Sequence, residues 1–257
     1  IAVELKGTSY AGISLDAEMD YLLNRIMFFT TLKDSVETNL IIKKTKIKAK
    51  DYIEKNINQY ANEIIEKWEK NQDIYSIKYF LLISTTTKNI TGFLESFKAK
   101  VTSEQDENKE SSNYKQKMEL LNNTLLNVKN HLATYQPRQM SSDEIINFYA
   151  TYSNAQETNL RYTNELITDS YISSYVEFKK DYIEFYRNDG TTKYARFISV
   201  KAYETEQIKS IITSNLIKSD HEFMTMIYFK AYEKRKAIKK IKDTRAFSVE
   251  LVQQELD

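Results

Sequence analysis

Two hydrophobic periods alternate over the first 83 residues, and this alternation constrains the fold more than any other feature of the chain. Apolar and polar residues alternate in Ile1–Lys6 and from Val36 to Ile42, a pattern typical of half-buried strands. The run Ile77–Ile83 is almost entirely apolar, which indicates a central strand covered on both sides. Leu15–Leu32 and the segment that begins at Asp51 repeat apolar residues at helical spacing. The expected order is β-α-β-α-β.

Each of these two helices is expected to bury one apolar face. In the first helix this face consists of Leu15, Met19, Leu22, Leu23, Ile26 and Met27. In the second helix it consists of Ile53, Ile57, Tyr60, Ala61, Ile64, Ile65 and Trp68. Residues three and four apart share a helix face, so each set forms a continuous stripe that a soluble protein would normally cover.

The middle of the chain is less regular. Asn89–Val101 is expected to be helical, whereas Thr102–Asn113 has no apolar anchor and is expected to be a solvated loop. The region 87–113 could be an insertion. Beyond it, apolar residues recur in steps of four and three, which predicts a coiled-coil-like seam: Tyr114, Met118, Leu121, Leu125, Val128, Leu132 and Tyr135. Three heptads are too few to require a partner chain, so we favour packing on a sheet or helix of the same chain.

The second half turns to β structure after one short helix. Pro137 ends the preceding helix, and Ser141 with Glu144 forms a capping-box pattern. The elements expected after it are strands at Ile172–Val176, Tyr182–Arg187 and Tyr194–Tyr203 with a turn at Asp189-Gly190, a helix at Glu206–Leu216, a strand at Phe223–Phe229 and a helix from about Glu233. The fold class is therefore mixed α/β with helix-rich lobes of about 1–154 and 155–257, joined near Ser153–Asn164.

Composition excludes several classes of protein. Of 257 residues, 41% are hydrophobic and 28% charged, as in an ordinary globular domain rather than a disordered one. A net charge of +1 provides no global attraction to nucleic acid or an anionic membrane. The absence of cysteine rules out disulfides and thiolate metal sites and fits a reducing cytoplasm. Apolar runs are far shorter than the ~20 residues that span a bilayer. Because the first residues already resemble a strand, the natural N-terminus is expected to lie upstream.

The motifs of nucleotide, metal and acyl-transfer chemistry do not occur in the sequence. Gly7 and Gly12 have the separation found in a phosphate-binding loop, and Ser14 fits its Ser/Thr position, but Ile13 stands where that loop requires Lys, so a strand-to-helix turn is expected. Asp143-Glu144 follows a helix start, where acidic residues complement the helix dipole. The histidines, His131 and His221, are far apart in the sequence, the first expected on a solvated helix flank and the second in a turn. The sequence therefore predicts no catalytic, cofactor or metal residue.

One charged constellation is a candidate binding surface. About three turns of the terminal helix carry seven basic residues, namely Lys234, Arg235, Lys236, Lys239, Lys240, Lys242 and Arg245. Such a helix can contact an acidic protein surface, anionic lipid headgroups or nucleic-acid phosphates, or it can simply be a solvated face, which we rank slightly ahead. Lys43, Lys44, Lys46 and Lys48 form a smaller group that we interpret as a solvated strand end.

From Lys193 to Arg245 the chain resembles the end of the N-terminal domain of the type IV secretion and conjugation ATPases, the CagE, TrbE and VirB family. The resemblance rests on "ISVKAYE", the helix after it, "HEFMTMIYF" and "KAYEKRKAIKKIKDTR". It extends to "VELKGTSYAGISLDAEMDYLLNRIMFF" near the start and to "LLNNTLLNVKNHLATYQPRQMSSDEIINFYATYSN" in the middle. No catalytic signature supports it, only the order of elements and the apolar pattern.

The resemblance implies a domain of a larger, oligomeric motor on the cytoplasmic face of the bacterial inner membrane. The parent would bind ATP and Mg²⁺ in a C-terminal domain absent from this chain and would energise machine assembly and the transport of protein or DNA. This chain would be noncatalytic and would contact inner-membrane and scaffold subunits, other copies of the protein and the membrane periphery. The alternative is a nucleic-acid-binding module that uses the basic helix with Tyr228 and Tyr232.

Overall fold

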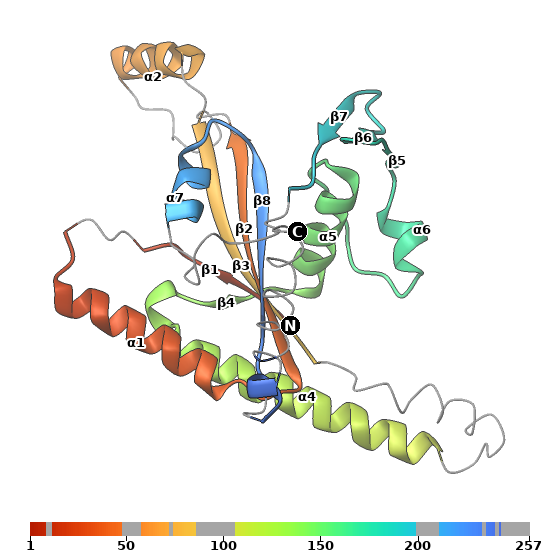
Figure 1. The fold of residues 1–257 in the computed structure, drawn as a ribbon. Helices are drawn as coiled ribbons and strands as arrows, with labels where there is room; N and C mark the ends of the chain where they lie inside the picture. Colours follow the sequence, from red (N-terminus) through yellow and green to blue (C-terminus); the bar gives the residue numbers. More distant parts are fainter. Residues whose placement is uncertain are drawn as a thin grey trace, which may run out of the picture. The chain divides into compact units, whose positions relative to one another are not determined.

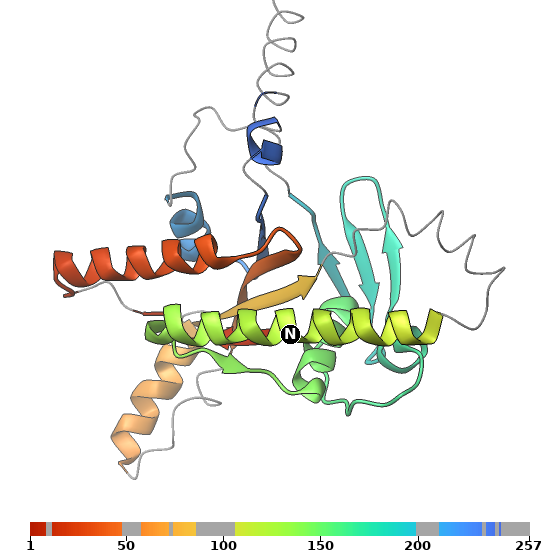
Figure 2. The same cartoon turned by 90° about the horizontal axis from the view of Figure 1, so that it is seen from below.

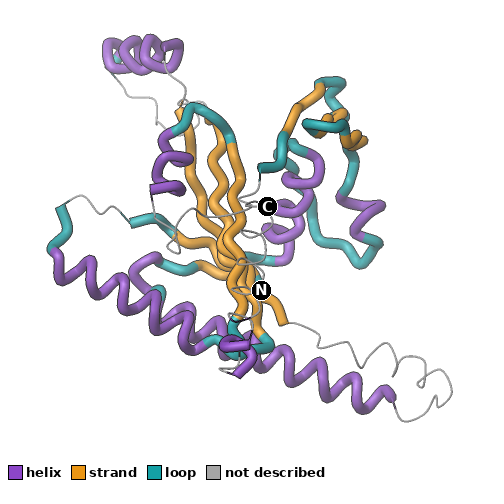
Figure 3. Tube along the Cα trace, in the orientation of Figure 1, coloured by secondary structure: helices purple, strands orange, loops and turns teal. Residues whose placement is uncertain are grey.

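The fold was analysed in a computed structural model that describes residues 1–8, 12–47, 58–71, 74–85, 106–198, 211–232, 235–239 and 242. The chain divides into two compact units. The first comprises Ile1–Arg138 together with Glu222–Asp257, and the second comprises Gln139–His221. Both contain an antiparallel sheet and helices (Figures 1 and 3), so the expected mixed α/β class is confirmed.

The sheet of the first unit is built around two long strands, β2 (Val36–Ile47) and β3 (Ile74–Thr85). They pair antiparallel over their whole length, from Val36 opposite Thr85 to Ile47 opposite Ile74. β1 (Ala2–Leu5) pairs with β3, and β8 (Phe223–Lys230) pairs with β2. With the short β4 (Arg138–Gln139) the strand order is β4-β1-β3-β2-β8. The sheet therefore joins the beginning of the chain to its end.

Two helices of the first unit, α1 (Leu15–Thr31) and α4 (Asp106–His131), contact each other and supply side chains to the core beside the sheet (Figure 2). The buried core combines one side chain of α1 with residues of β1, β2, β3 and α4 and its C-terminal end: Val3, Phe28, Val36, Leu81, Ile83, Leu125, Val128 and Leu132. From Leu121 onward the predicted seam packs within its own chain, as we favoured, whereas Tyr114 and Met118 at its start are exposed. A third helix, α2 (Gln59–Asn71), lies between β2 and β3 in the sequence.

The structure corrects two expectations in this unit. Asp106–Asn113 belongs to α4 and is not a loop, because a helix anchored further along can propagate through polar residues at little cost. The predicted inner face of α1 lies outside: its six apolar residues are all exposed, and Phe28 on another side of the helix is the buried anchor. Tyr60 and Ile64 of α2, also predicted to be inside, are exposed as well.

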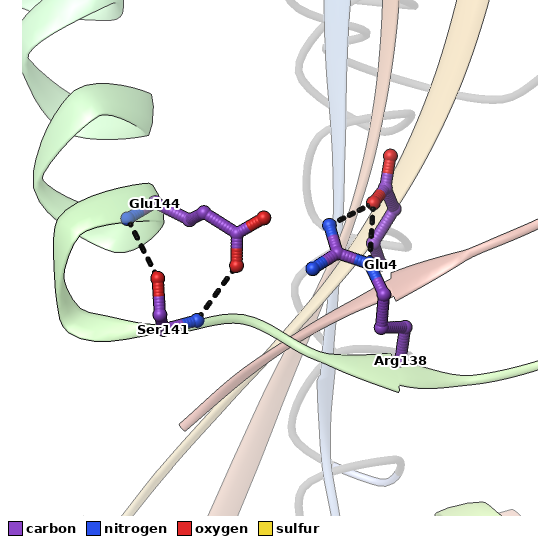
Figure 4. Close-up of polar contacts among 4 residues, drawn as sticks. All are labelled: Glu4, Arg138, Ser141 and Glu144. Atoms are coloured by element: carbon purple, nitrogen blue, oxygen red, sulfur yellow. Dashed lines mark hydrogen bonds and ion pairs between the residues drawn. The ribbon is translucent and has the colours of Figure 1, made fainter. Parts of the chain in front are cut away.

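The second unit begins with α5 (Ser142–Asn154) and α6 (Ile167–Tyr171). A three-stranded sheet follows, in the order β5 (Tyr175–Phe178), β6 (Ile183–Tyr186) and β7 (Thr192–Ala195), and then α7 (Ile211–Lys218). The predicted capping box at the start of α5 is confirmed, since the Ser141 hydroxyl accepts from the Glu144 N–H and the Glu144 carboxylate accepts from the Ser141 N–H (Figure 4). The predicted turn is also confirmed, with Gly190 at φ +77° between β6 and β7.

Two asparagines on α5 fix the chain that follows this helix. Asn147 donates to Leu160 O and accepts from Leu160 N, at 2.6 and 2.7 Å. Asn154 is 1% exposed; its amide donates to Ala150 O and Tyr171 O, and its oxygen accepts from the N–H groups of Ser173 and Ser174. These bonds satisfy backbone groups that would otherwise be buried without partners.

The compact units divide the chain differently from the expected lobes of 1–154 and 155–257. Residues after 154 are bonded back to α5, and β8 pairs with β2 of the first unit. The predicted strand at Ile172–Val176 is displaced, because β5 begins at Tyr175. The predicted helix at 89–101, part of the helix at 206–216 and most of the terminal helix lie outside the described residues.

Candidate docking surfaces

The glycine pair near the N-terminus has a structural explanation. Ser14 caps α1, and its hydroxyl accepts a hydrogen bond from Ala17 N at 3.2 Å. A Cβ on Gly7 would lie 3.1 Å from the Tyr79 ring, and Gly12 has φ +80°. The residues thus have the roles expected of a strand-to-helix turn, because β1 ends at Leu5 and α1 begins at Leu15.

The acidic pair Asp143-Glu144 and the histidines His131 and His221 lie at separate positions in the fold. Glu144 completes the capping box, and Asp143 Oδ1 accepts from Tyr162 N at 2.7 Å. His131 is half-buried at the end of α4, where more exposure was expected, and His221 is exposed just before β8. Across the described residues, no group of three or more His, Cys, Asp or Glu side chains is arranged to hold a metal ion.

The structure describes only part of the predicted basic patch. Arg235, Lys236, Lys239 and Lys242 are exposed, and Ile238 between them is 46% exposed. The other three members, Lys234, Lys240 and Arg245, lie outside the described residues. The described part is therefore an accessible cationic surface with an apolar side chain at its centre.

The smaller basic group on β2 is not simply a solvated strand end. Lys44 is buried, and its Nζ lies 4.2 Å from the centroid of the Tyr75 ring, at a distance typical of a cation–π contact. The backbone N–H of Lys46 donates to the Glu222 carboxylate at 2.9 Å. The first contact joins β2 to β3, and the second attaches β2 to the residue that precedes β8, while Lys48 lies outside the described residues.

Among the described helices, α1 carries the most exposed large apolar residues. Four residues define what we name the α1 seam: Leu15, Met19, Leu22 and Ile26, with exposed fractions between 41 and 76%. Leu23 and Met27 beside them are similarly exposed. Contiguous apolar surface of this kind is uncommon on soluble monomers and marks contact sites.

A second exposed surface lies on one face of the β5–β6–β7 sheet. Register places Tyr175, Tyr186 and Tyr194 on the same face as Glu177 and Glu184. The Tyr175 and Tyr186 ring centroids lie 5.7 Å apart. Tyr186 Oη donates to Glu184 at 2.6 Å, and this bond raises the pKa of Tyr186 to about 12. The sequence signal for this face is the period-two alternation of Tyr and Glu, which was missed above.

Comparison with known families identifies the second half of the chain. Residues 130–255 match the model of the CagE, TrbE, VirB family, component of type IV transporter system. This stretch belongs to that family. The match confirms the resemblance drawn from the sequence for these residues, which include the second unit, β8 and the basic residues after it. No curated protein matches the chain.

The family description relates the matched stretch to a component of a type IV transporter system. The matched residues begin at the end of α4, so α1 and the long β2–β3 pair lie before them. Within the described residues, no helix is both long and apolar enough to cross a membrane.

Proposed function

We propose that this chain is a noncatalytic N-terminal docking and assembly domain of a type IV secretion ATPase. The family match of residues 130–255 carries the proposal. The exposed α1 seam, the tyrosine face of the small sheet and the cationic residues after β8 support it, because apolar, aromatic and basic surfaces are what protein contacts use.

The chemistry of the parent protein is assigned to another domain. ATP and Mg²⁺ would bind there, in a motor that energises assembly of the machine and translocation of protein or DNA during secretion or conjugation. The strand-to-helix turn between Leu5 and Leu15 supports this division. Ser14 of the turn caps α1, and the position where a phosphate-binding loop requires lysine is not a lysine.

The proposed partners are the inner-membrane and scaffold subunits of the machine and other copies of the parent protein. The proposed place is the cytoplasmic face of the bacterial inner membrane, with peripheral contact through the exposed cations Arg235, Lys236, Lys239 and Lys242.

Dominant interference tests the proposal. Produced alone in a cell with an active type IV system, the chain should occupy the docking position of the full-length ATPase and lower transfer of protein or DNA. It should also copurify with inner-membrane subunits and bind no ATP in calorimetry. Undiminished transfer together with no copurified subunit would contradict the docking role, and ATP binding would contradict the noncatalytic assignment.

Nucleic-acid binding is the second candidate. Tyr228 and Tyr232 are exposed near the cationic residues, as a stacking surface for single strands requires. Against it, Glu37 accepts a hydrogen bond from Tyr228, which places an acid beside that ring and raises the pKa of Tyr228. Affinity for single-stranded DNA that falls steeply with salt and disappears on Lys239→Glu with Lys242→Glu would favour this function.

A further inference from the structure

The α1 seam has the geometry of one side of a coiled coil. Leu15, Met19, Leu22 and Ile26 are separated by steps of four, three and four residues, and Phe29 continues the series. This spacing places alternate a and d positions on one line along the helix. The Phe29 ring lies 4.5 Å from Phe229 of β8, so the C-terminal end of the series already has a contact within the chain. The four residues before it form an exposed seam ready for a second helix.

The rest of α1 holds this seam in place. Phe28 is 1% exposed in the core, and Tyr21 lies on the same side of the helix with its ring 6.4 Å from that of Tyr135. In both views the N-terminal half of α1 extends past the sheet of its unit (Figures 1 and 2). Phe28 and Tyr21 therefore anchor one side of the helix, and the α1 seam lies on another, exposed side. Binding a partner would require no unfolding of α1.

Charge selects the partner. In the heptad set by the seam, Asp16 and Leu23 occupy e positions and Glu18 and Arg25 occupy g positions, so two exposed acids flank its N-terminal half. Residues at e and g decide which helix a coiled-coil helix accepts. This acidic N-terminal half of the seam would be repelled by anionic lipid. A helix with Lys or Arg beside its apolar ridge would instead be attracted.

We propose that the α1 seam binds an α-helix of another protein, one whose apolar heptad ridge is flanked by basic residues. The inference rests on the proposed docking function, for which it names the surface and the chemistry of the partner. Coiled-coil pairing would place the partner's ridge residues between the four seam side chains, with its cations opposite Asp16 and Glu18.

A designed peptide pair tests the proposal on the intact chain. The probe is a labelled helix of about three heptads with Leu at a and d, Lys at e and g and Ala elsewhere; Lys repulsion keeps it from pairing with itself. Its counterpart has Glu at e and g, and a third peptide has the Lys composition in scrambled order. Fluorescence anisotropy should show binding of the Lys helix at least about tenfold tighter than either control, weakening as salt rises.

Variants locate the site. Leu22→Gln with Ile26→Gln should weaken binding of the Lys helix at least about tenfold, because polar amides replace two exposed seam residues without disturbing the core. Asp16→Asn with Glu18→Gln should reduce the difference between the Lys and Glu helices. The matched control, Tyr60→Gln with Ile64→Gln, changes exposed apolar residues of α2 and should leave binding unchanged. Circular dichroism melts verify that each variant is folded.

Several results would overturn the inference. These are equal binding of the Lys, Glu and scrambled peptides, no binding at all, or an equal loss in the α2 control. Self-association or binding to phosphatidylglycerol vesicles that disappears in the Leu22→Gln, Ile26→Gln variant would assign the seam to a second copy or to lipid. If that variant still interferes with transfer as the unmodified chain does, the docking function stands and only the α1 seam is excluded.

Discussion

At the scale of single residues, the amide of Asn154 makes the most consequential polar contacts of the second unit. It donates to Ala150 O and Tyr171 O and accepts from Ser173 N and Ser174 N, with distances of 2.7 to 2.9 Å. The side chain is 1% exposed, so water cannot replace these bonds. This one amide fixes the backbone between α6 and β5 to the end of α5.

Removing that amide should destabilise the second unit. Asn154→Ala is expected to cost about 3 kcal/mol, because it leaves buried N–H and C=O groups without partners. Asn154→Asp keeps the acceptor but loses both donated bonds and should also destabilise. Urea unfolding measures the change, and Asn164→Ala, at an exposed position, is the matched control. A loss of unfolding free energy equal to that of the control would show that the hydrogen bonds of Asn154 do not stabilise the second unit.

Thr38 presents the opposite case, a buried hydroxyl near the start of β2. The residue is fully buried, and its Oγ1 has no hydrogen-bond partner in the described part of the chain. Thr38→Val keeps the shape and removes the unsatisfied oxygen, so unfolding should require about 1 kcal/mol more. Thr124→Val is the contrast, since the Thr124 hydroxyl donates to Leu120 O at 2.8 Å and its loss should bring no gain. A destabilised Thr38→Val variant would contradict this account of β2.

At the scale of elements, an ion pair joins β8 to β2. Lys230 Nζ contacts the Glu37 carboxylate, and the two residues stand opposite each other in the register. The hydrogen bond from Lys230 lowers the pKa of Glu37 below its ordinary 4.5, and the same contact raises the pKa of Lys230. The charged pair therefore favours the folded state only while Glu37 is ionised.

The sign of the pH dependence follows from these shifts. A carboxyl whose pKa is lowered by folding stabilises the protein above pH 4.5, and the contribution is lost as pH falls through the lower, folded value. Glu37→Gln should thus be less stable than the unmodified chain at pH 7, by no more than about 1 kcal/mol, with the difference vanishing in acid. Thermal melts from pH 7 to about pH 3 measure it. A difference in stability between the two proteins that persists in acid would rule out the ion pair as its cause.

The sequence predicted elements better than it predicted their surroundings. Most strands, α1 and the α5 capping box were predicted because periodicity and caps are local signals, although the strands expected at Ile172–Val176 and Tyr194–Tyr203 differ from the observed β5 and β7. The prediction that the apolar face of α1 is buried was wrong. Periodicity shows that Leu15 and Leu22 share a helix face, but it does not show whether the rest of the chain covers that face. The pairing of β8 with β2 was also missed, because nothing local to Phe223–Lys230 specifies a partner at Val36–Ile47.

For the candidate surfaces, too, the sequence predicted the residues better than their exposure. The basic residues after β8 and the family resemblance were visible in the sequence, because charge runs and the order of elements survive without coordinates. The α1 seam was recognised as an apolar stripe but taken for core. The acidic residues Asp16 and Glu18 beside it indicate the charge of a partner only once Leu15 and Met19 are known to be exposed.

At the scale of the whole molecule, the two compact units have separate cores. Leu125 of α4 belongs to the core of the first unit, whereas Ala150 and Tyr171 belong to the core of the second. Leu125→Ala should remove about 3 kcal/mol from the first core through lost burial and the cavity left behind. Asn154→Ala should weaken the second core alone. Damage to one unit should thus leave the other protected.

Native-state hydrogen exchange measures this separation peptide by peptide. Leu125→Ala should accelerate exchange in β2, β3 and β8, because β8 is part of that sheet although it follows the second unit in the sequence. Asn154→Ala should accelerate exchange in α5, α6 and β5 and leave β2 and β3 unchanged. Faster exchange of β8 together with α5 in the Asn154→Ala variant, with β2 unaffected, would place β8 in the second cooperative unit. Faster exchange throughout the chain in both variants would show that the two cores unfold as one.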